Sequence, residues 1–166
     1  DEETAATLFG NPDDPFLNRA INGMYPAGST FKPIPAYVAL TSGARTSSEI
    51  WNDRGTYRLS GCRSSAATKG CVFRNAKGVV MGPLALREAL TRSSDTYFYS
   101  LGEKFWVDRG IYGDEIMQET ARRFGLGRPT GIELPGEAAG RVPSPAQRQA
   151  DHDNYPEAFP EPRWFT

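Results

Sequence analysis

Apolar residues fall into short helical patterns that glycine and proline separate. Residues 33–42 have the spacing of a buried helix face, which ends near Gly43 and holds Ile34, Tyr37, Val38 and Leu40. Pro33 fits a first helical turn, whereas Pro35 either removes a hydrogen bond or moves the start of the helix by a few residues. The pattern therefore predicts a buried helix that follows a proline-containing start.

Further apolar patterns predict helices at residues 84–90, 96–105 and 114–124. Pro83 suits the first turn of the first of these helices, with Leu86 and Leu90 one turn apart. The polar residues 91–95 end that helix and cap the next one, which is mostly apolar and therefore buried. A polar turn between two core helices holds its side chains rigidly, as an active site requires.

The remaining segments lack a helical period. Residues 1–20 predict a loop, residues 44–80 predict loops with short strands, and residues 130–136 predict a short strand and turn. Residues 141–166 are rich in proline and predict an extended segment. The chain contains no internal repeat.

The composition indicates one loop-rich domain. The 166 residues suffice for a single core, and 17 glycines and 13 prolines predict many loops. Lysine and arginine (19) balance aspartate and glutamate (20), so the charge does not indicate a nucleic-acid partner. The sequence has no apolar run of membrane-spanning length and no signal-peptide pattern.

Ser29 and Lys32 are the strongest candidates for chemistry, because they lie three residues apart at the predicted start of the first helix. Residues at i and i+3 share a helix face, so we expect the Ser29 hydroxyl and the Lys32 amine to meet. A desolvated lysine activates a serine by taking its proton, and a helix N-terminus offers N–H groups to a developing oxyanion. The alternative is structural, with Ser29 as a helix cap and Lys32 as a solvated cation.

Cys62 and Cys71 flank a polar segment of eight residues. A disulfide across this loop is the favoured interpretation, and it implies an oxidising compartment. Two free thiols are the alternative. A zinc site is disfavoured, because the only histidine, His152, is distant in sequence and is expected at the surface.

Ser29-x-x-Lys32 and the later Ser93-Ser94-Asp95 resemble the first two motifs of a known enzyme superfamily, S-x-x-K and S-D-N. The surrounding strings are more specific: NRAI at 18–21, GSTFKP at 28–33, ALTRSSDTYFY at 89–99, FGLG at 124–127 and TGIELPGE at 130–137. Through these strings, most of the chain resembles the transpeptidase domain of monofunctional, class B penicillin-binding proteins, most closely the type that serves side-wall elongation.

This resemblance implies an α/β fold like that of penicillin-binding protein transpeptidases and serine β-lactamases, with a helical subdomain and an antiparallel sheet. The chain would supply mainly the helical half, with short strands and loops. The resemblance also implies a penicillin-sensitive D,D-transpeptidase. Ser29 would attack the D-Ala-D-Ala carbonyl, Lys32 would accept the proton, Ser93 would shuttle it, and the Ser29 backbone N–H would form half of the oxyanion hole.

The chain departs from the superfamily pattern in two ways. Asp95 stands where the superfamily usually has asparagine; the resemblance makes it a substrate-binding residue, although an ionised carboxylate cannot donate a hydrogen bond. The third motif, Lys-Thr-Gly or Lys-Ser-Gly, is absent from the sequence. We therefore expect residues 1–166 to be the N-terminal and central part of one transpeptidase domain. The remaining sheet and the third motif would lie on a separate or cleaved C-terminal polypeptide, without which the chain would be inactive.

The resemblance further implies peptidoglycan stem peptides and β-lactams as ligands, a glycosyltransferase partner, and no nucleic acid. It places the protein, with a membrane anchor that these residues lack, at the extracytoplasmic face of a bacterial membrane. No metal or organic cofactor is expected. Two alternatives remain open: a serine β-lactamase or β-lactam sensor of the same fold, and a non-catalytic cell-wall scaffold domain.

Overall fold

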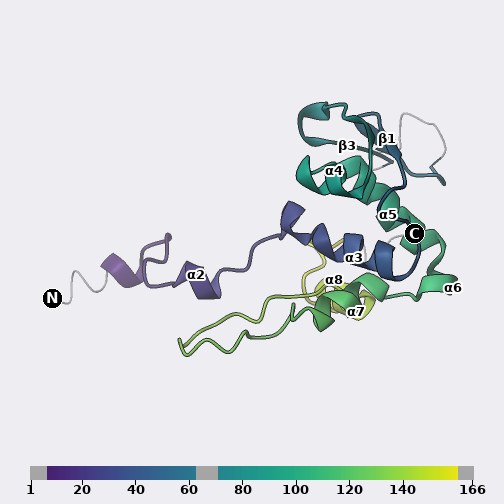
Figure 1. Ribbon diagram of the computed structural model, residues 1–166. Helices are drawn as coiled ribbons and strands as arrows, with labels where there is room; N and C mark the ends of the chain where they lie inside the picture. The colour runs from purple at the N-terminus through teal and green to yellow at the C-terminus, as the bar shows by residue number, and fades with distance from the viewer. Residues whose placement is uncertain (1–6, 63–70, 161–166) are drawn as a thin grey trace. The chain divides into compact units, whose positions relative to one another are not determined.

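The computed structural model describes residues 7–62 and 71–160 (Figure 1). Contacts divide the chain into two compact units. We call Ala27–Thr120 the central unit, and Asp1–Pro26 with Ala121–Thr166 the terminal unit. All four predicted catalytic and substrate-binding residues belong to the central unit.

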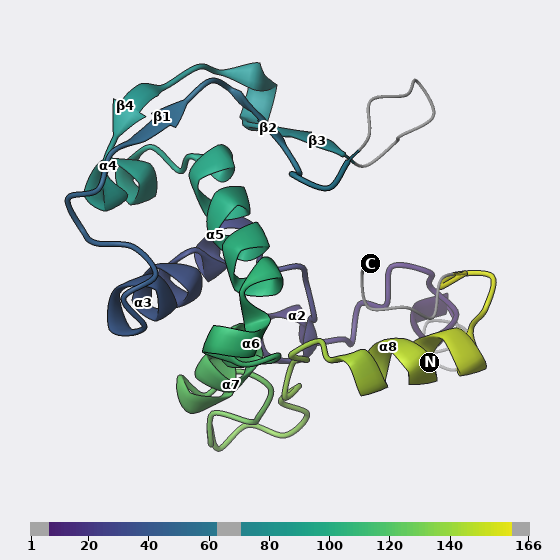
Figure 2. The same cartoon turned by 90° about the vertical axis from the view of Figure 1, so that its right-hand side faces the viewer.

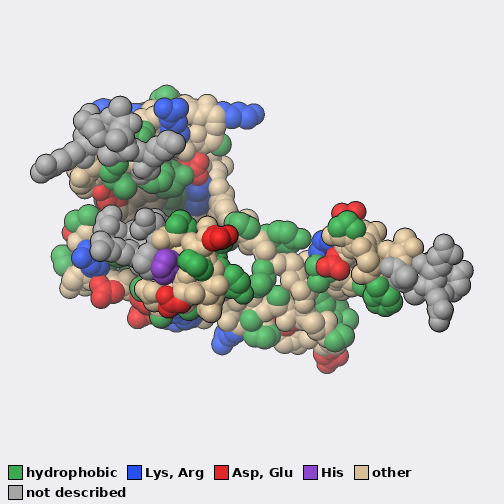
Figure 3. Space-filling model, turned by 180° about the vertical axis from the view of Figure 1, so that it is seen from behind, with side chains coloured by type: hydrophobic (Ala, Val, Ile, Leu, Met, Phe, Trp, Pro, Cys, Tyr) green, Lys and Arg blue, Asp and Glu red, His purple; other side chains and the backbone are tan. Residues whose placement is uncertain are grey.

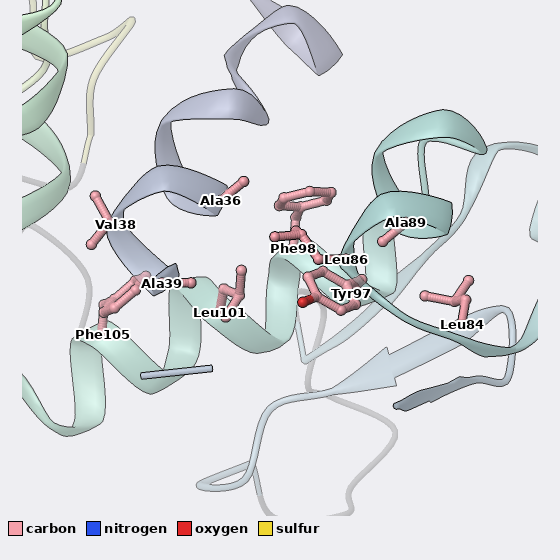
Figure 4. Packing of buried hydrophobic residues seen from close by; sticks show 10 residues of the cluster. All are labelled: Ala36, Val38, Ala39, Leu84, Leu86, Ala89, Tyr97, Phe98, Leu101 and Phe105. Carbon is pink, nitrogen blue, oxygen red and sulfur yellow. The ribbon is translucent and has the colours of Figure 1, made fainter. Parts of the chain in front are cut away.

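Two helices, α3 (Pro33–Thr41) and α5 (Asp95–Val107), form the core of the central unit. Figure 4 shows their apolar side chains facing each other, together with residues before and within α4 (Leu86–Thr91). The buried cluster consists of Ala36, Val38, Ala39, Leu84, Leu86, Ala89, Tyr97, Phe98, Leu101 and Phe105. Because α5 carries four of these residues, it is the element against which the rest of the unit packs.

The helix α3 begins at Pro33, after a 3-10 helix, η1, at Gly28–Phe31. This start places Pro35 in the first helical turn, where a missing N–H removes no helical hydrogen bond. The predicted buried face was wrong in part, because Tyr37 is 39% exposed and Leu40 is 45% exposed. The buried face instead contains Ile34, Pro35, Ala36, Val38 and Ala39.

Four short strands form two antiparallel pairs, which Figure 2 shows beside α5. β1 (Trp51–Asp53) pairs with β4 (Gly82–Leu84), and β2 (Thr56–Arg58) pairs with β3 (Val72–Arg74). The helix predicted at 84–90 therefore begins later than expected. Pro83 lies in β4 opposite Asn52, which a two-stranded sheet tolerates because each strand has a free edge.

A disulfide joins Cys62 to Cys71, as the sequence favoured, with the Cα atoms 5.8 Å apart. The bridge lies beyond the ends of β2 and β3 that point away from β1 and β4. It therefore closes the β2–β3 pair covalently.

The polar residues between α4 and α5 form the predicted cap. Ser94 is the N-cap of α5, and its hydroxyl accepts a hydrogen bond from the Tyr97 N–H at 3.2 Å. Another 3-10 helix, η2 (Ala76–Gly78), follows β3, and α6 (Arg109–Tyr112) and α7 (Ile116–Arg123) follow α5. The predictions for residues 96–105 and 114–124 were thus correct in type and approximate in their bounds.

The terminal unit contains α2 (Arg19–Asn22) and α8 (Pro145–Asn154). The expectation of an extended segment after residue 141 was wrong, because Ser144 caps α8 and Pro145 occupies its first turn. The strand predicted at 130–136 is also absent, since this segment folds around Glu137, which accepts hydrogen bonds from Thr130. Residues 161–166 lie outside the described part of the chain.

His152 lies on α8, and one ring nitrogen is 2.8 Å from the Phe159 carbonyl oxygen. Its side chain reaches the surface in Figure 3, where it is drawn in purple. Among the helices of residues 7–62 and 71–160, none is both long enough and apolar enough to cross a membrane.

Candidate active site

Ser29 lies in η1, where Gly28 has a positive φ of 55° and starts the turn into α3. The hydroxyl of Ser29 is exposed and accepts a hydrogen bond from the Ser93 hydroxyl at 3.1 Å. Ser29 does not act as a side-chain cap for η1 or α3. Its backbone N–H donates to no acceptor within the described residues, so it is available to an incoming oxygen atom.

Lys32 is almost buried, at 9% exposure, between η1 and α3. Its Nζ atom donates to Asp95 Oδ1 at 2.6 Å, to Ser93 Oγ at 2.8 Å and to the Ser93 carbonyl oxygen at 2.8 Å. The same atom lies 5.6 Å from the centre of the Phe98 ring. These three acceptors match the three N–H bonds of an ammonium group, so Lys32 is fixed in direction by its partners.

The side chains of Ser29 and Lys32 were expected to meet, but within residues 7–62 and 71–160 they form no direct hydrogen bond. Lys32 turns toward the start of α5, so the Ser93 hydroxyl lies between the two side chains. Lys32 donates to Ser93 Oγ, and Ser93 donates to Ser29 Oγ. The three predicted residues therefore form one continuous hydrogen-bonded series in the order Lys32, Ser93, Ser29.

Ser93 occupies the left-handed region, with a φ of 56°. This conformation is costly for a residue other than glycine and is typical of functional sites. Two backbone hydrogen bonds hold the turn, from the Ser93 N–H to the Leu90 carbonyl at 3.1 Å and from the Ser94 N–H to the Ala89 carbonyl at 2.9 Å. The turn aims both the hydroxyl and the carbonyl oxygen of Ser93 at Lys32.

Both carboxylate oxygens of Asp95 are engaged. Oδ1 forms the ion pair with Lys32, and Oδ2 accepts a hydrogen bond from the Ala76 N–H at 3.2 Å. An asparagine here could accept from only one of these donors. The geometry thus makes Asp95 the partner of Lys32, and the predicted role in substrate binding stays a prediction.

Two buried polar residues beside this site were not found from the sequence. Asp53 ends β1 and is fully buried, and Asn75 follows β3 with 3% exposure. Asp53 accepts hydrogen bonds from Ser94 Oγ at 2.5 Å and from Asn75 Nδ2 at 2.8 Å. The spacing Asp-Arg-Gly at 53–55 is a turn signal, but nothing in the sequence connects that turn with Ser94.

Comparison with known proteins identifies the class. The model of the penicillin binding protein transpeptidase domain matches residues 1–155. The chain therefore belongs to the penicillin-binding protein transpeptidase domain family. Its mostly helical structure with short antiparallel strands agrees with the fold of this family.

The relatives include the peptidoglycan D,D-transpeptidase MrdA of Acinetobacter baumannii, which is 34% identical over 140 residues, 84% of this chain and 19% of that protein. Penicillin-binding protein PBP2 of Pseudomonas aeruginosa, solved in complex with WCK 5153, is 31% identical with a TM-score of 0.72. That match covers 92% of this chain and 30% of PBP2.

Penicillin-binding protein A of Mycobacterium tuberculosis, solved as its imipenem acyl-enzyme complex, is 31% identical with a TM-score of 0.62, over 86% of this chain and 31% of that chain. The chain thus spans about a fifth of the length of the curated relative and less than a third of the two solved chains.

Proposed function

We propose that the protein is a peptidoglycan D,D-transpeptidase in which Ser29 is the nucleophile. The observation that carries this proposal is the hydrogen-bonded series from Lys32 through Ser93 to Ser29. Serine attacks a carbonyl only when a neighbouring group takes its proton, and this series offers a path for that proton. The D,D-transpeptidase among the relatives and the acyl-enzyme of penicillin-binding protein A support the same chemistry.

In the proposed acylation step, Ser29 Oγ bonds to the carbonyl carbon of a D-Ala-D-Ala peptide. Its proton passes to Ser93, which gives its own proton to Lys32. To accept it, Lys32 must be a neutral amine, which keeps two N–H donors for Asp95 and the Ser93 carbonyl and turns its lone pair toward Ser93 Oγ. The Ser29 N–H stabilises the oxyanion of the tetrahedral intermediate.

Collapse of this intermediate breaks the peptide bond. The terminal D-alanine leaves as a free amine, and it takes its proton from Lys32 through Ser93. An amine of a neighbouring stem peptide then attacks the ester, forms the cross-link and returns the proton to Ser29. A β-lactam would acylate Ser29 in the same way, with ring opening in place of the departure of D-alanine.

We also propose that residues 1–166 form one part of the transpeptidase domain. The absence of a Lys-Thr-Gly motif and the small share of the relatives that the chain covers support this. A further polypeptide segment would supply that motif, the rest of the sheet and the second oxyanion N–H. The substrates would be peptidoglycan stem peptides, and a glycosyltransferase that makes the glycan strands would be a partner.

We further propose an extracytoplasmic location at the bacterial cell membrane. The Cys62–Cys71 disulfide supports this location, because disulfides persist in oxidising compartments. Stem peptides that await cross-linking lie on the same side of the membrane.

The test uses the complete protein and a fluorescent penicillin, with Ser29→Ala as the control. We expect a stable covalent adduct whose mass maps to Ser29, and release of D-alanine from a stem pentapeptide when an amine acceptor is present. Rapid hydrolysis of the penicillin adduct by water would instead support the β-lactamase alternative. An unlabelled, folded protein would overturn acyl transfer and favour the scaffold alternative.

A further inference from the structure

Asp53 is the centre of a buried polar cluster that borders the candidate active site. Its carboxylate accepts hydrogen bonds from the Gly55 N–H at 2.7 Å, from Asn75 Nδ2 at 2.8 Å to each oxygen, and from Ser94 Oγ at 2.5 Å. All of these partners in the described part of the chain are donors. Burial acts to raise the pKa of Asp53, but these hydrogen bonds, with a contribution from Thr96, outweigh burial and lower the pKa below its ordinary value.

The partners of Asp53 lead directly to the reacting groups. Ser94 follows Ser93 in the chain and caps α5, so its hydroxyl connects Asp53 with the turn that aims Ser93 at Lys32. Asn75 precedes Ala76, whose N–H holds Oδ2 of Asp95. Lys32 is hydrogen-bonded to Ser93 and Asp95. Asp53 therefore binds Ser94, which lies between these two residues in the chain, and Asn75, which precedes the residue that binds Asp95.

Asn75 strengthens the connection on the other side. Its Oδ1 accepts the Thr96 N–H at 3.0 Å, and its Nδ2 also reaches the Val79 carbonyl at 2.8 Å. The segment after β3 is thus joined to the first turn of α5 by side-chain hydrogen bonds. The exposed fractions of Asp53, Asn75, Ser94 and Thr96 are 0%, 3%, 0% and 0%, so water does not compete for these bonds.

We propose that Asp53 is a positioning residue for acyl transfer, which acts through Ser94 and Asn75 to hold Ser93 and Asp95 against Lys32. The proposal rests on the proposed function. Asp53 touches neither Ser29 nor Lys32, so it takes no part in proton transfer itself. Its contribution is geometric, because small displacements of catalytic groups cost large factors in rate.

The variant Asp53→Asn tests this role with little change in volume. An amide places an NH2 group among donors and keeps only one acceptor oxygen, so at least one of the bonds to Ser94, Asn75 and Gly55 is lost. We expect the rate constant of Ser29 acylation by a fluorescent penicillin to fall about 10- to 100-fold. The dissociation constant of the non-covalent penicillin complex should change by less than about threefold, because the binding surface is kept.

Glu103 provides a matched control on α5. Among the described residues its carboxylate also binds donors, the Ser60 N–H and hydroxyl at 2.6 Å each and the Tyr57 hydroxyl, and neither partner is hydrogen-bonded to the Lys32–Ser93–Ser29 series. Glu103→Gln should lower the unfolding temperature while the acylation rate constant stays within about twofold of wild type. Acylation is measured in the complete protein, at a temperature where every variant is folded.

The outcomes separate this inference from the proposed function. A wild-type protein that does not label at Ser29 overturns the proposed function, and the inference with it. With wild type labelled, an unchanged acylation rate constant in Asp53→Asn, or an equal loss in Glu103→Gln, overturns the positioning role alone. Should Asp53→Asn fail to fold, Ser94→Ala, which keeps the carboxylate and cuts its link to the turn, decides by the same criteria.

Discussion

Ser93 combines a strained backbone, with a φ of 56°, and a hydroxyl that lies between Lys32 and Ser29. Ser93→Ala and Ser93→Gly both remove the hydroxyl between Lys32 and Ser29, so each should slow penicillin acylation of Ser29 by about 10²- to 10⁴-fold. Their stabilities should differ, because only glycine adopts a φ of 56° without cost. We expect the glycine variant to be more stable than the alanine variant by about 1 kcal/mol.

Thermal unfolding and stopped-flow labelling of the two variants in the complete protein measure these quantities. Equal stability would contradict the strain at Ser93. Retained acylation would contradict its place in the proton path. The two results are independent, because the first depends on the backbone and the second on the missing oxygen atom.

Among single residues, the motifs predicted the candidate catalytic residues but not the residues that hold them in place. Ser29, Lys32, Ser93 and Asp95 were predicted from motifs, and the structure brings them together. The predicted direct Ser29–Lys32 hydrogen bond was wrong, because Ser93 and Asp95, which lie 61 and 63 positions after Lys32, hold the Lys32 amine. Asp53 was beyond prediction, since a buried carboxylate finds its partners 22 and 41 residues away only after folding.

Among the contacts between secondary-structure elements, Glu103 connects α5 with the β2–β3 pair, because its carboxylate accepts hydrogen bonds from Tyr57 in β2 and from Ser60 after it. Burial acts to raise the pKa of Glu103, but hydrogen bonds from Ser60 and Tyr57 outweigh burial and lower the pKa below its ordinary value of 4.5. A lowered pKa in the folded state means that the contribution to stability is present above pH 4.5 and is lost as the pH falls through the folded-state value.

Glu103→Gln should therefore destabilise the protein by about 1–3 kcal/mol at neutral pH. The difference from wild type should shrink as the pH falls below 4.5. Unfolding of both proteins across a pH series measures this difference. A difference that grows toward acid would show that the carboxylate is not stabilised by these donors.

The Cys62–Cys71 disulfide should also stabilise the β2–β3 pair. Cys62 and Cys71 are separated by nine positions, and closing a loop of that size stabilises the folded state by about 2–3 kcal/mol in the loop-entropy model. The double variant Cys62→Ser, Cys71→Ser should lose about this amount and keep its rate of penicillin acylation. Reductant should lower the stability of wild type by the same amount as the double substitution does, and it should leave the double variant unchanged. A change in the stability of the double variant on reduction would contradict the attribution of this effect to the Cys62–Cys71 disulfide.

Local signals predicted some elements and misread others. Helix α5 was predicted because its apolar residues and its polar cap indicate the same helix. Residues 82–84 were placed in or next to a helix because Pro83 suits a first turn, yet pairing with β1 prevailed. Helix α8 was missed among prolines, although Ser144-Pro145 is a common helix start, because its residues have little apolar character.

At the scale of the whole molecule, the fold class could be predicted because long strings of sequence, rather than periodicity, indicated the family. Periodicity alone gives helices and short strands without saying which of them meet. The packing of α3 on α5, with the Ser93 turn beside Lys32, depends on contacts between residues about 60 positions apart. Such contacts become predictable from sequence only through resemblance to a family of known fold.

The proposed division of the transpeptidase domain can be tested by comparing residues 1–166 with the complete protein. In the complete protein, fluorescent penicillin should label Ser29, because the Lys-Thr-Gly strand would bind the carboxylate of the drug and complete the oxyanion hole. The 166-residue chain holds Lys32, Ser93 and Ser29 but no such motif, so its labelling should be at least about 100-fold slower. Intact-mass analysis of both proteins, with Ser29→Ala as the control, measures this ratio. Equal labelling of the two proteins would mean that residues 1–166 form a complete acylation site and that the proposed division is wrong. If adding the remaining polypeptide restores the labelling of the 166-residue chain, the two parts assemble into one site.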